Sequence, residues 1–380
     1  MSNSSAFSRF LIHLQLILIA LILLNCGSST SNNSQPNVVT ATIKTDVFKP
    51  VSSSLPISTA SEVGLNEDTL LSTYQMAATQ PDLRSLLVIK NQQLIAEAYF
   101  NNTNPNTKLH LRSVTKTVTA MLIGIAIEQG LLLGPDQKIA EFFIEDYPSL
   151  SSNKADITIG DLLTMTSGFL WNEAEYLNWE SSNDPINYLL RNDLVYVPGN
   201  QFNYNSAAVH LLAVILDKVA ANGLSDFAEQ HLFSPLGILD FRWDKLKDGR
   251  YNGGAGLQLK AIDTAKFAMM LLDNGRLNDK QIVPESWVNQ SKMPQIEFSN
   301  PYVFGTMNLS GYGYLRWLGN GNTENVSVAW GWGGQFITIV PDKELIVITN
   351  SRHNVVASQA DKQEKANFEI IVNGVFAALD

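Results

Sequence analysis

The segment Ser113-Val114-Thr115-Lys116 has the residue types and spacing of an activated serine nucleophile. A serine hydroxyl attacks poorly until a base removes its proton, and residues at positions i and i+3 of a helix share one face. Lysine can be that base only where its charge is suppressed, and burial near the positive N-terminal end of a helix lowers its pKa. We therefore predict Ser113 as the nucleophile and Lys116 as its base. The competing interpretation of Ser113 is an ordinary serine at a helix N-terminus.

A second Ser-x-x-Lys segment, from Ser151 to Lys154, offers a comparison within the same chain. It lies in a polar stretch where nothing would remove water from the lysine. Residues 111–130, around Ser113, instead carry apolar side chains at helical spacing. This context favours Ser113 over Ser151.

The loop from Pro198 to Ser206 leads into a long apolar helix and contains Tyr204. A phenol beside a cationic lysine has a lowered pKa and can accept a proton and later return it. Tyr204 is therefore the third candidate catalytic residue. Taken alone, it would be interpreted as a packed aromatic side chain.

A glycine-rich segment, Gly-Trp-Gly-Gly-Gln, ends at Gln335 and runs directly into an apolar strand. Glycines let a backbone approach a ligand closely, and a backbone N–H at a strand edge can donate to an oxyanion. We predict the N–H groups of Gln335 and Ser113 as the oxyanion hole, and Trp332, Gly333 and Gly334 as part of the substrate site. Alone, the segment would fit a tight turn closed by an aromatic residue.

Strands and helices must position these segments. Two hairpins are predicted, over residues 83–100 and 335–349. Residues 111–130 predict a mostly buried helix with Gly130 as its stop signal, and a closing helix is predicted over 363–379. The section 157–237 is predicted to be mainly helical. Strands at both ends with helices between them indicate an α+β architecture.

In this order, the three segments resemble the serine β-lactamase/penicillin-binding-protein superfamily, specifically its class C β-lactamase-like branch. That branch includes Trp-Gly-Gly esterases and 6-aminohexanoate-oligomer hydrolases. The resemblance runs from about Ser58 to the end of the chain and includes the flanking strings ITIGDLLTMTSG, GGAGL and YGY. It implies a helical subdomain packed on an antiparallel five-stranded sheet, with the site at their junction. It also implies that Ser113 is acylated, with Lys116 and Tyr204 as its partners.

Two departures from the family pattern bear on the substrate. Ser206 stands where the family's Tyr-x-Asn segment has Asn, so the hydrogen bonds of that Asn to a substrate amide do not carry over; Ser206 is kept as a candidate substrate contact. Trp332 stands where β-lactamases and carboxypeptidases have the lysine of Lys-Thr-Gly, whose cation helps to bind a carboxylate. The resemblance therefore implies an uncharged ester or amide substrate.

The expected reaction is a double displacement. Ser113 Oγ, deprotonated by Lys116 and Tyr204 as a coupled pair, attacks the carbonyl, and Tyr204 protonates the leaving group. Water then repeats the cycle and releases the acid. No metal or organic cofactor is expected, because the five histidines lack metal-ligand spacing. They are interpreted as structural residues: His13, His110, His210, His231 and His353.

Three other classes of protein compete with this interpretation. An α/β-hydrolase would carry a Gly-x-Ser-x-Gly elbow, and the chain has none. A peptidoglycan D-alanyl-D-alanine carboxypeptidase or a weak β-lactamase would use the same serine and lysine, but the absence of Lys-Thr-Gly weighs against both. A non-catalytic binding or sensor lipoprotein would have no chemical need for Ser113, Lys116 and Tyr204 together.

Composition excludes nucleic acid as an expected partner. Of 380 residues, 26 are Lys or Arg and 36 are Asp or Glu, so the formal net charge of −10 has the wrong sign for a phosphate backbone. The single cysteine, Cys26, cannot form an intramolecular disulfide. Packing must therefore hold the fold.

The N-terminus has the pattern of an export signal. An apolar run over residues 10–24 is short for a membrane span and is followed by Leu-Leu-Asn-Cys-Gly, which resembles a bacterial lipobox with Asn25 where Gly or Ala is usual. We predict a signal peptide over 1–26 with lipidation of Cys26, a Ser/Thr/Asn/Pro-rich flexible tether over 27–56, and a hydrolase domain over 57–380. The protein would then be an exported lipoprotein anchored to a membrane of the bacterial cell envelope. The competing interpretation is an uncleaved signal anchor with an idle thiol.

Overall fold

The computed structural model describes residues 54–148, 150 and 152–379. The predicted signal peptide, Cys26 and most of the predicted tether lie outside the described residues. Among the described residues, no single helix has the length and apolar composition of a membrane span. The pair Ser206–Val219 and Gly223–Phe233, bent by 86°, meets those criteria only when taken together.

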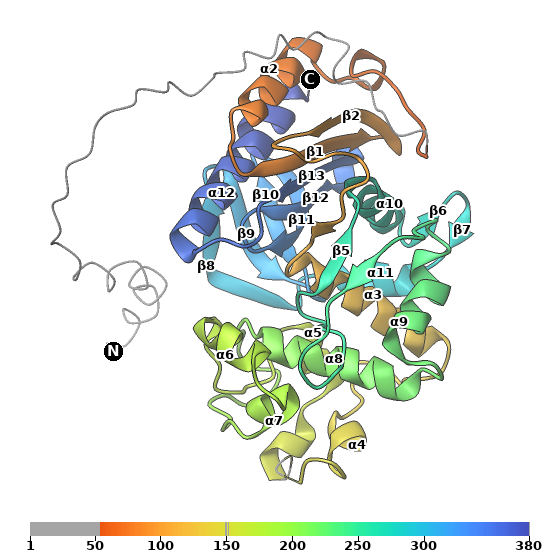
Figure 1. The fold of residues 1–380 in the computed structure, drawn as a ribbon, viewed down its shortest axis with the longest axis vertical. Coiled ribbons are helices and arrows are strands. Elements are labelled where there is room, and N and C mark those ends of the chain that lie inside the picture. Colours follow the sequence, from red (N-terminus) through yellow and green to blue (C-terminus); the bar gives the residue numbers. More distant parts are fainter. Residues whose placement is uncertain (1–53, 149, 151, 380) are drawn as a thin grey trace, which may run out of the picture. The chain divides into compact units, whose positions relative to one another are not determined.

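An antiparallel sheet of eight strands, in the order β2-β1-β13-β12-β11-β10-β9-β8, organises the described chain (Figure 1). Both ends of the chain contribute its first half: β1 (Leu83–Lys90), β2 (Gln93–Tyr99), β12 (Gln335–Val340) and β13 (Leu345–Ser351). Its second half consists of β8 (Ile296–Phe304), β9 (Met307–Tyr312), β10 (Trp317–Gly321) and β11 (Glu324–Gly331). Every residue of β12 and β13 is buried, so the middle of the sheet is covered on both faces.

The sheet has eight strands, whereas five were expected. The additional strands come from the segment between residues 296 and 331, whose sequence does not show a clear strand pattern. In β8, exposed residues dominate, Pro301 interrupts the run, and the register with β9 shifts between Glu297 and Tyr302. β10 contains Gly319 and Gly321, which lower strand propensity. Neither strand shows the apolar run that predicted the two hairpins.

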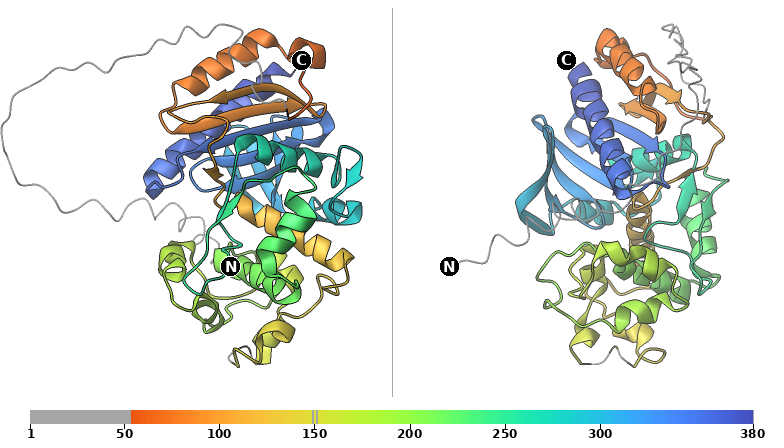
Figure 2. Two further views of the ribbon diagram at one scale, coloured as in Figure 1. Left: turned by 45° about the vertical axis from the view of Figure 1, so that its right-hand side comes forward. Right: turned by 60° about the vertical axis from the view of Figure 1, so that its left-hand side comes forward.

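Helices cover both faces of the sheet. Helices α2 (Glu67–Ala78) and α12 (Ala357–Glu369) lie toward one face, and α10 (Ala261–Leu272) lies against the other (Figures 1 and 2). Helix α3 (Val114–Glu128) is buried at every residue from Val114 to Ala126, and Gly130 follows it in the left-handed conformation with φ 70°. The mostly buried helix and its glycine stop are therefore confirmed.

The section 157–237 is mainly helical, as predicted. It contains α5 (Ile159–Leu163), α6 (Tyr176–Glu180), α7 (Pro185–Leu190), α8 (Ser206–Val219), α9 (Gly223–Ala228) and the π-helical turn Glu229–Phe233. Helix α8 lies at its centre and contacts α3, α5, α6, α7 and α9. This contact between α3 and α8 joins the helical section to the element that carries Ser113.

The remaining elements are short. They are α4 (Ala140–Phe143), α11 (Glu285–Ser291), the hairpin of β6 (Arg276–Leu277) and β7 (Lys280–Gln281), and a small sheet of β3 (Leu109–His110), β4 (Arg242–Trp243) and β5 (Leu257–Leu259). Both predicted hairpins are present. The closing helix begins at Ala357 rather than near Gln363. The prediction missed its first turns because they are polar and lack the apolar spacing on which the prediction rested.

Candidate active site

Ser113 and Lys116 lie together at the start of α3, where Ser113 is the N-cap residue. Lys116 Nζ lies 2.8 Å from Ser113 Oγ. Lys116 is 1 % exposed, and this burial lowers its pKa to about 8 against the opposing charge of Glu173. The expected depression of the lysine pKa is therefore confirmed, and an appreciable fraction of Lys116 is neutral in weakly alkaline solution.

A glycine-rich string holds Lys116 from the other side. Its Nζ donates to the carbonyl of Gly254 at 2.7 Å, and Thr119 donates to the neighbouring carbonyl of Gly253 at 2.9 Å. A Cβ at Gly253 would lie only 2.4 Å from the Cβ of Ala213 on α8. The GGAGL string therefore lets the backbone fit between α3 and α8 and contact the buried amine.

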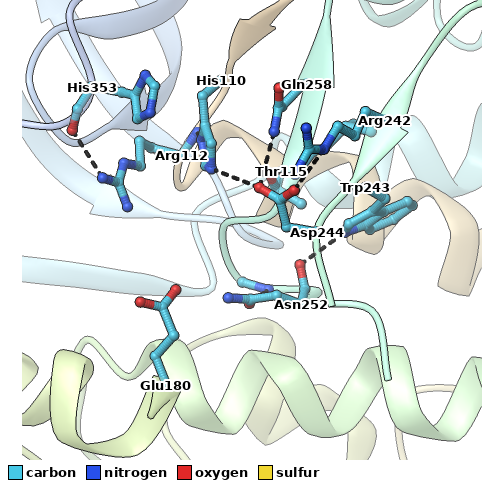
Figure 3. A network of polar contacts seen from close by, with 12 residues as sticks. His110, Arg112, Thr115, Glu180, Arg242, Trp243, Asp244, Asn252, Gln258 and His353 are labelled. Carbon is cyan, nitrogen blue, oxygen red and sulfur yellow. Dashed lines mark hydrogen bonds and ion pairs between the residues drawn. The ribbon is translucent and has the colours of Figure 1, made fainter. Parts of the chain in front are cut away.

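The residue before Ser113 has a strained backbone that a polar network supports (Figure 3). Arg112 has φ 49°, and its N–H donates to Nδ1 of His110 at 3.0 Å while its guanidinium donates to the carbonyl of His353 at 2.9 Å. The imidazole rings of His110 and His353 stack with their centroids 4.7 Å apart. Burial, and then the charge of Arg112, lower the pKa of His110 to about 3, so its ring is neutral and Nδ1 can accept. His110 thus orients the backbone that presents Ser113.

Tyr204 completes the group around Ser113. Lys116 Nζ lies 5.1 Å from its ring centroid, its ring stacks on Trp317 at 5.9 Å, and the nearby Ser113 side chain acts to lower its pKa. The expected lowering of its pKa is wrong: burial, and then the charge of Glu173, raise the pKa of Tyr204. The phenol therefore keeps its proton in the free protein.

Glu173 is a site residue that the sequence analysis missed. Its carboxylate accepts hydrogen bonds from the indole N–H of Trp171 at 2.7 Å, from the backbone N–H of Ser206 at 3.2 Å and from the Ser206 hydroxyl. The hydroxyl of Ser206, a candidate substrate contact, is thus bonded to Glu173. Glu173 and Ser206 are 33 positions apart, and no rule of sequence spacing predicts such a contact. The only sign of it in the sequence is an acidic residue in the loop after Trp171.

Helix α12 holds the turn between β11 and β12. Gly333 and Gly334 have φ values of 77° and 90°, which favour glycine. The N–H of Gly333 donates to Glu364 at 2.8 Å, and the side chain of Asn367 donates to the carbonyl of Gly334 at 2.8 Å. Burial raises the pKa of Glu364 to about 7. The predicted turn is therefore fixed by two side chains that the sequence did not single out.

Trp332 and Gln335 flank these glycines and differ in exposure. Trp332 is 42 % exposed, and its indole N–H donates to the carbonyl of Val355 at 3.3 Å. The Gln335 side chain is buried and exchanges two 3.0 Å hydrogen bonds with the backbone of Ser351. With its amide occupied in this way, the Gln335 side chain is not available to a substrate.

The glycine-rich segment meets the nucleophile at the end of β11. A Cβ at Gly331 would lie 2.5 Å from the carbonyl oxygen of Leu111 and 3.2 Å from the Cβ of Arg112. The start of the glycine turn therefore contacts the residues that precede Ser113. In the described part of the chain, no group of three or more His, Cys, Asp and Glu side chains is arranged to hold a metal ion.

A serine, a buried lysine and a tyrosine, gathered where α3 and α8 meet, define a serine hydrolase of the β-lactamase type. The family model described as Beta-lactamase matches residues 79–369, and the chain belongs to this family. It is 22% identical over 293 residues to the 6-aminohexanoate-dimer hydrolase of Paenarthrobacter ureafaciens, covering 70% of this chain and 71% of that protein.

Solved structures share the fold. A Bacillus anthracis protein assigned as a 6-aminohexanoate-dimer hydrolase has a TM-score of 0.69 at 17% identity, covering 88% of this chain and 90% of that one. A family VIII carboxylesterase has a TM-score of 0.58 at 15% identity, covering 80% and 96%. The β-lactamase/transpeptidase-like fold predicted from the sequence is therefore confirmed.

The Glu173→Gln variant is expected to move the acidic limb of the pH–rate profile to lower pH. The Glu173 carboxylate raises the pKa of Lys116, so its removal lowers that pKa and leaves Lys116 neutral at lower pH. Glutamine keeps an oxygen that can accept from Ser206. The measurement is kcat/KM for a neutral ester between pH 5.5 and 9.5. If the acidic limb of the Glu173→Gln profile did not move, or moved to higher pH, the proposed effect of Glu173 on the pKa of Lys116 would be contradicted.

Proposed function

We propose that the protein cleaves an uncharged ester or amide through an acyl intermediate on Ser113. The observation that carries this proposal is the position of Ser113 Oγ, 2.8 Å from the buried Lys116 Nζ, which in turn lies 5.1 Å from the ring centroid of Tyr204. A serine between a proton acceptor and a proton donor has what acyl transfer needs: activation of the nucleophile and protonation of the leaving group.

The proton path follows from the pKa values. Neutral Lys116 accepts the Ser113 proton as Oγ attacks the carbonyl carbon, and the backbone N–H groups of Ser113 and Gln335 are the candidate donors to the oxyanion. Tyr204 gives its proton to the leaving oxygen or nitrogen and regains one from Lys116. Water then attacks the acyl-serine, loses a proton through the same pair, and releases the acid as Ser113 is reprotonated.

The substrate class rests on Trp332 and on the relatives. An exposed indole replaces the cation that would hold a substrate carboxylate, which favours a neutral group beside the scissile bond. One relative is named as a 6-aminohexanoate-dimer hydrolase and a structural neighbour as a carboxylesterase, so we keep both amides and esters as candidate substrates.

The proposal is tested with four substrates: a 4-nitrophenyl butyrate ester, a neutral butyryl 4-nitroanilide, a chromogenic cephalosporin and a peptide ending in D-Ala-D-Ala. Hydrolysis of the ester or the anilide, with little of the last two, is expected. Faster hydrolysis of the peptide or the cephalosporin would replace the proposal with a carboxypeptidase or a β-lactamase. Inactivity on all four by a folded protein would favour a non-catalytic binder.

We also propose that the protein is an exported lipoprotein attached to a membrane through Cys26. The support is the apolar run followed by a lipobox-like string in the sequence. When the full-length chain is expressed in bacteria with radiolabelled palmitate, label is expected on the wild type and not on Cys26→Ala. Equal labelling of both chains would remove this proposal.

A further inference from the structure

A cavity of about 540 Å³ lies on the α10 face of the sheet. Leu318 of β10 pairs with Ser327 of β11, which pairs with Ile339 of β12, and all three line the cavity. Neighbouring residues of a strand point to opposite faces, and the ring of Trp317, next to Leu318, stacks on Tyr204. None of Ser113, Lys116 and Tyr204 lines this cavity, so it is distinct from the catalytic group.

The cavity contains a buried cation that forms no ion pair in the described part of the chain. Arg316 lines it and is 3 % exposed. Within the described part of the chain, its guanidinium forms no ion pair and its Nε has no hydrogen-bond partner. Arginine is almost never buried without a partner, because removing its charge from water is costly and the group does not readily lose its proton. The site is therefore short of negative charge.

A second cation and two hydroxyls line the same cavity. Lys292 donates to Asn274 at 2.7 Å, and burial and then the nearby charge of Arg316 lower its pKa. The side chains of Ser310 and Ser327 add hydroxyl donors. Glu297 also lines the cavity but is exposed, and within the described residues it forms no ion pair with either cation. The two charges thus repel each other and would both be stabilised by one anion.

We propose that this cavity binds a small organic anion whose charged group contacts Arg316 and Lys292. The planar guanidinium fork fits the oxygens of a carboxylate or a phosphate monoester. The apolar walls formed by Leu271, Leu318 and Ile339 would contact a short alkyl chain. The volume is that of a small-ligand site rather than of a single inorganic ion.

Calorimetry and thermal unfolding of the full-length chain test this site with sodium hexanoate, hexyl phosphate and hexylammonium chloride. At least one of the two anions is expected to bind and to raise the Tm. Comparison of hexanoate with hexyl phosphate shows whether the site prefers a carboxylate or a phosphate. Hexylammonium should neither bind nor raise the Tm. Arg316→Met should weaken anion binding at least tenfold, and its ligand-free Tm should equal or exceed that of the wild type, since an unpaired buried charge is removed.

Lys116→Met is the matched control, because it removes the other buried cation, in the catalytic group. Anion binding should persist in this variant. If Arg316→Met does not fold, Arg316→Gln replaces it with the same expected loss of binding. The proposal is overturned if neither anion binds the wild type, if the Arg316 variant binds as tightly as the wild type, or if Lys116→Met alone abolishes binding.

Discussion

The Ser113→Ala variant is expected to lose at least about 10⁴-fold in kcat/KM for the nitrophenyl ester, which is typical of the removal of a nucleophile. The reason is geometric: in the described structure, Ser113 Oγ is the hydroxyl that lies beside the buried amine of Lys116. Steady-state kinetics on the purified chain, with thermal unfolding alongside, measures this effect. Since Ser113 is only partly buried, the Tm should change little.

The chain offers its own control in the second Ser-x-x-Lys segment. Ser151→Ala should keep wild-type kinetics within about a factor of two, because that segment lacks the apolar context of α3. If Ser113→Ala retained more than a tenth of the activity, or if Ser151→Ala lost as much, the assignment of the nucleophile would be wrong.

The Lys116→Met variant is expected to lose about 10³-fold in kcat, within the usual range for removing a general base. Methionine has a similar length and no charge, so it can fill the space of the buried side chain. Removal of the buried charge opposes the loss of the hydrogen bond to the Gly254 carbonyl, so the Tm of the variant should stay close to that of the wild type. A loss of activity without a loss of Tm distinguishes a chemical role from a packing role.

Lys154→Met is the control for this loss of a lysine. Lys154 donates to the carbonyl of Leu190 at 2.9 Å from a 3-10 turn, so its replacement can cost some stability. It should leave kcat nearly unchanged. Equal losses in the two variants, or a Lys116→Met enzyme as active as the wild type, would contradict the role of Lys116 as base.

The sequence predicted the contact between Ser113 and Lys116, the candidate nucleophile and base, because that contact is local. Residues three apart share a face wherever a helix forms, and the apolar spacing of residues 111–130 predicted both that helix and its burial. Two of the three catalytic candidates could thus be placed before the fold was known. The contact of Tyr204 with Ser113, 91 positions earlier, came only from the family resemblance.

The sign of the Tyr204 pKa shift could not be predicted from the lysine alone. It depends on how deeply the phenol packs against Trp317 and on the position of Glu173, and neither follows from sequence spacing. The Glu173–Ser206 contact and the support of Gly333 by Glu364 likewise join residues about thirty positions apart. Such contacts depend on tertiary packing, whereas the two predicted hairpins and helix α3 follow from local patterns.

The most direct test of the catalytic assignment is to locate a covalent adduct. The purified wild-type chain is treated with a fluorophosphonate, and intact-mass analysis and peptide mapping identify the modified residue. A single adduct on Ser113, formed faster as the pH rises through about 8 and absent in Ser113→Ala, is the expected result. An adduct on another residue, or an active enzyme in which Ser113 stays unmodified, would contradict the account.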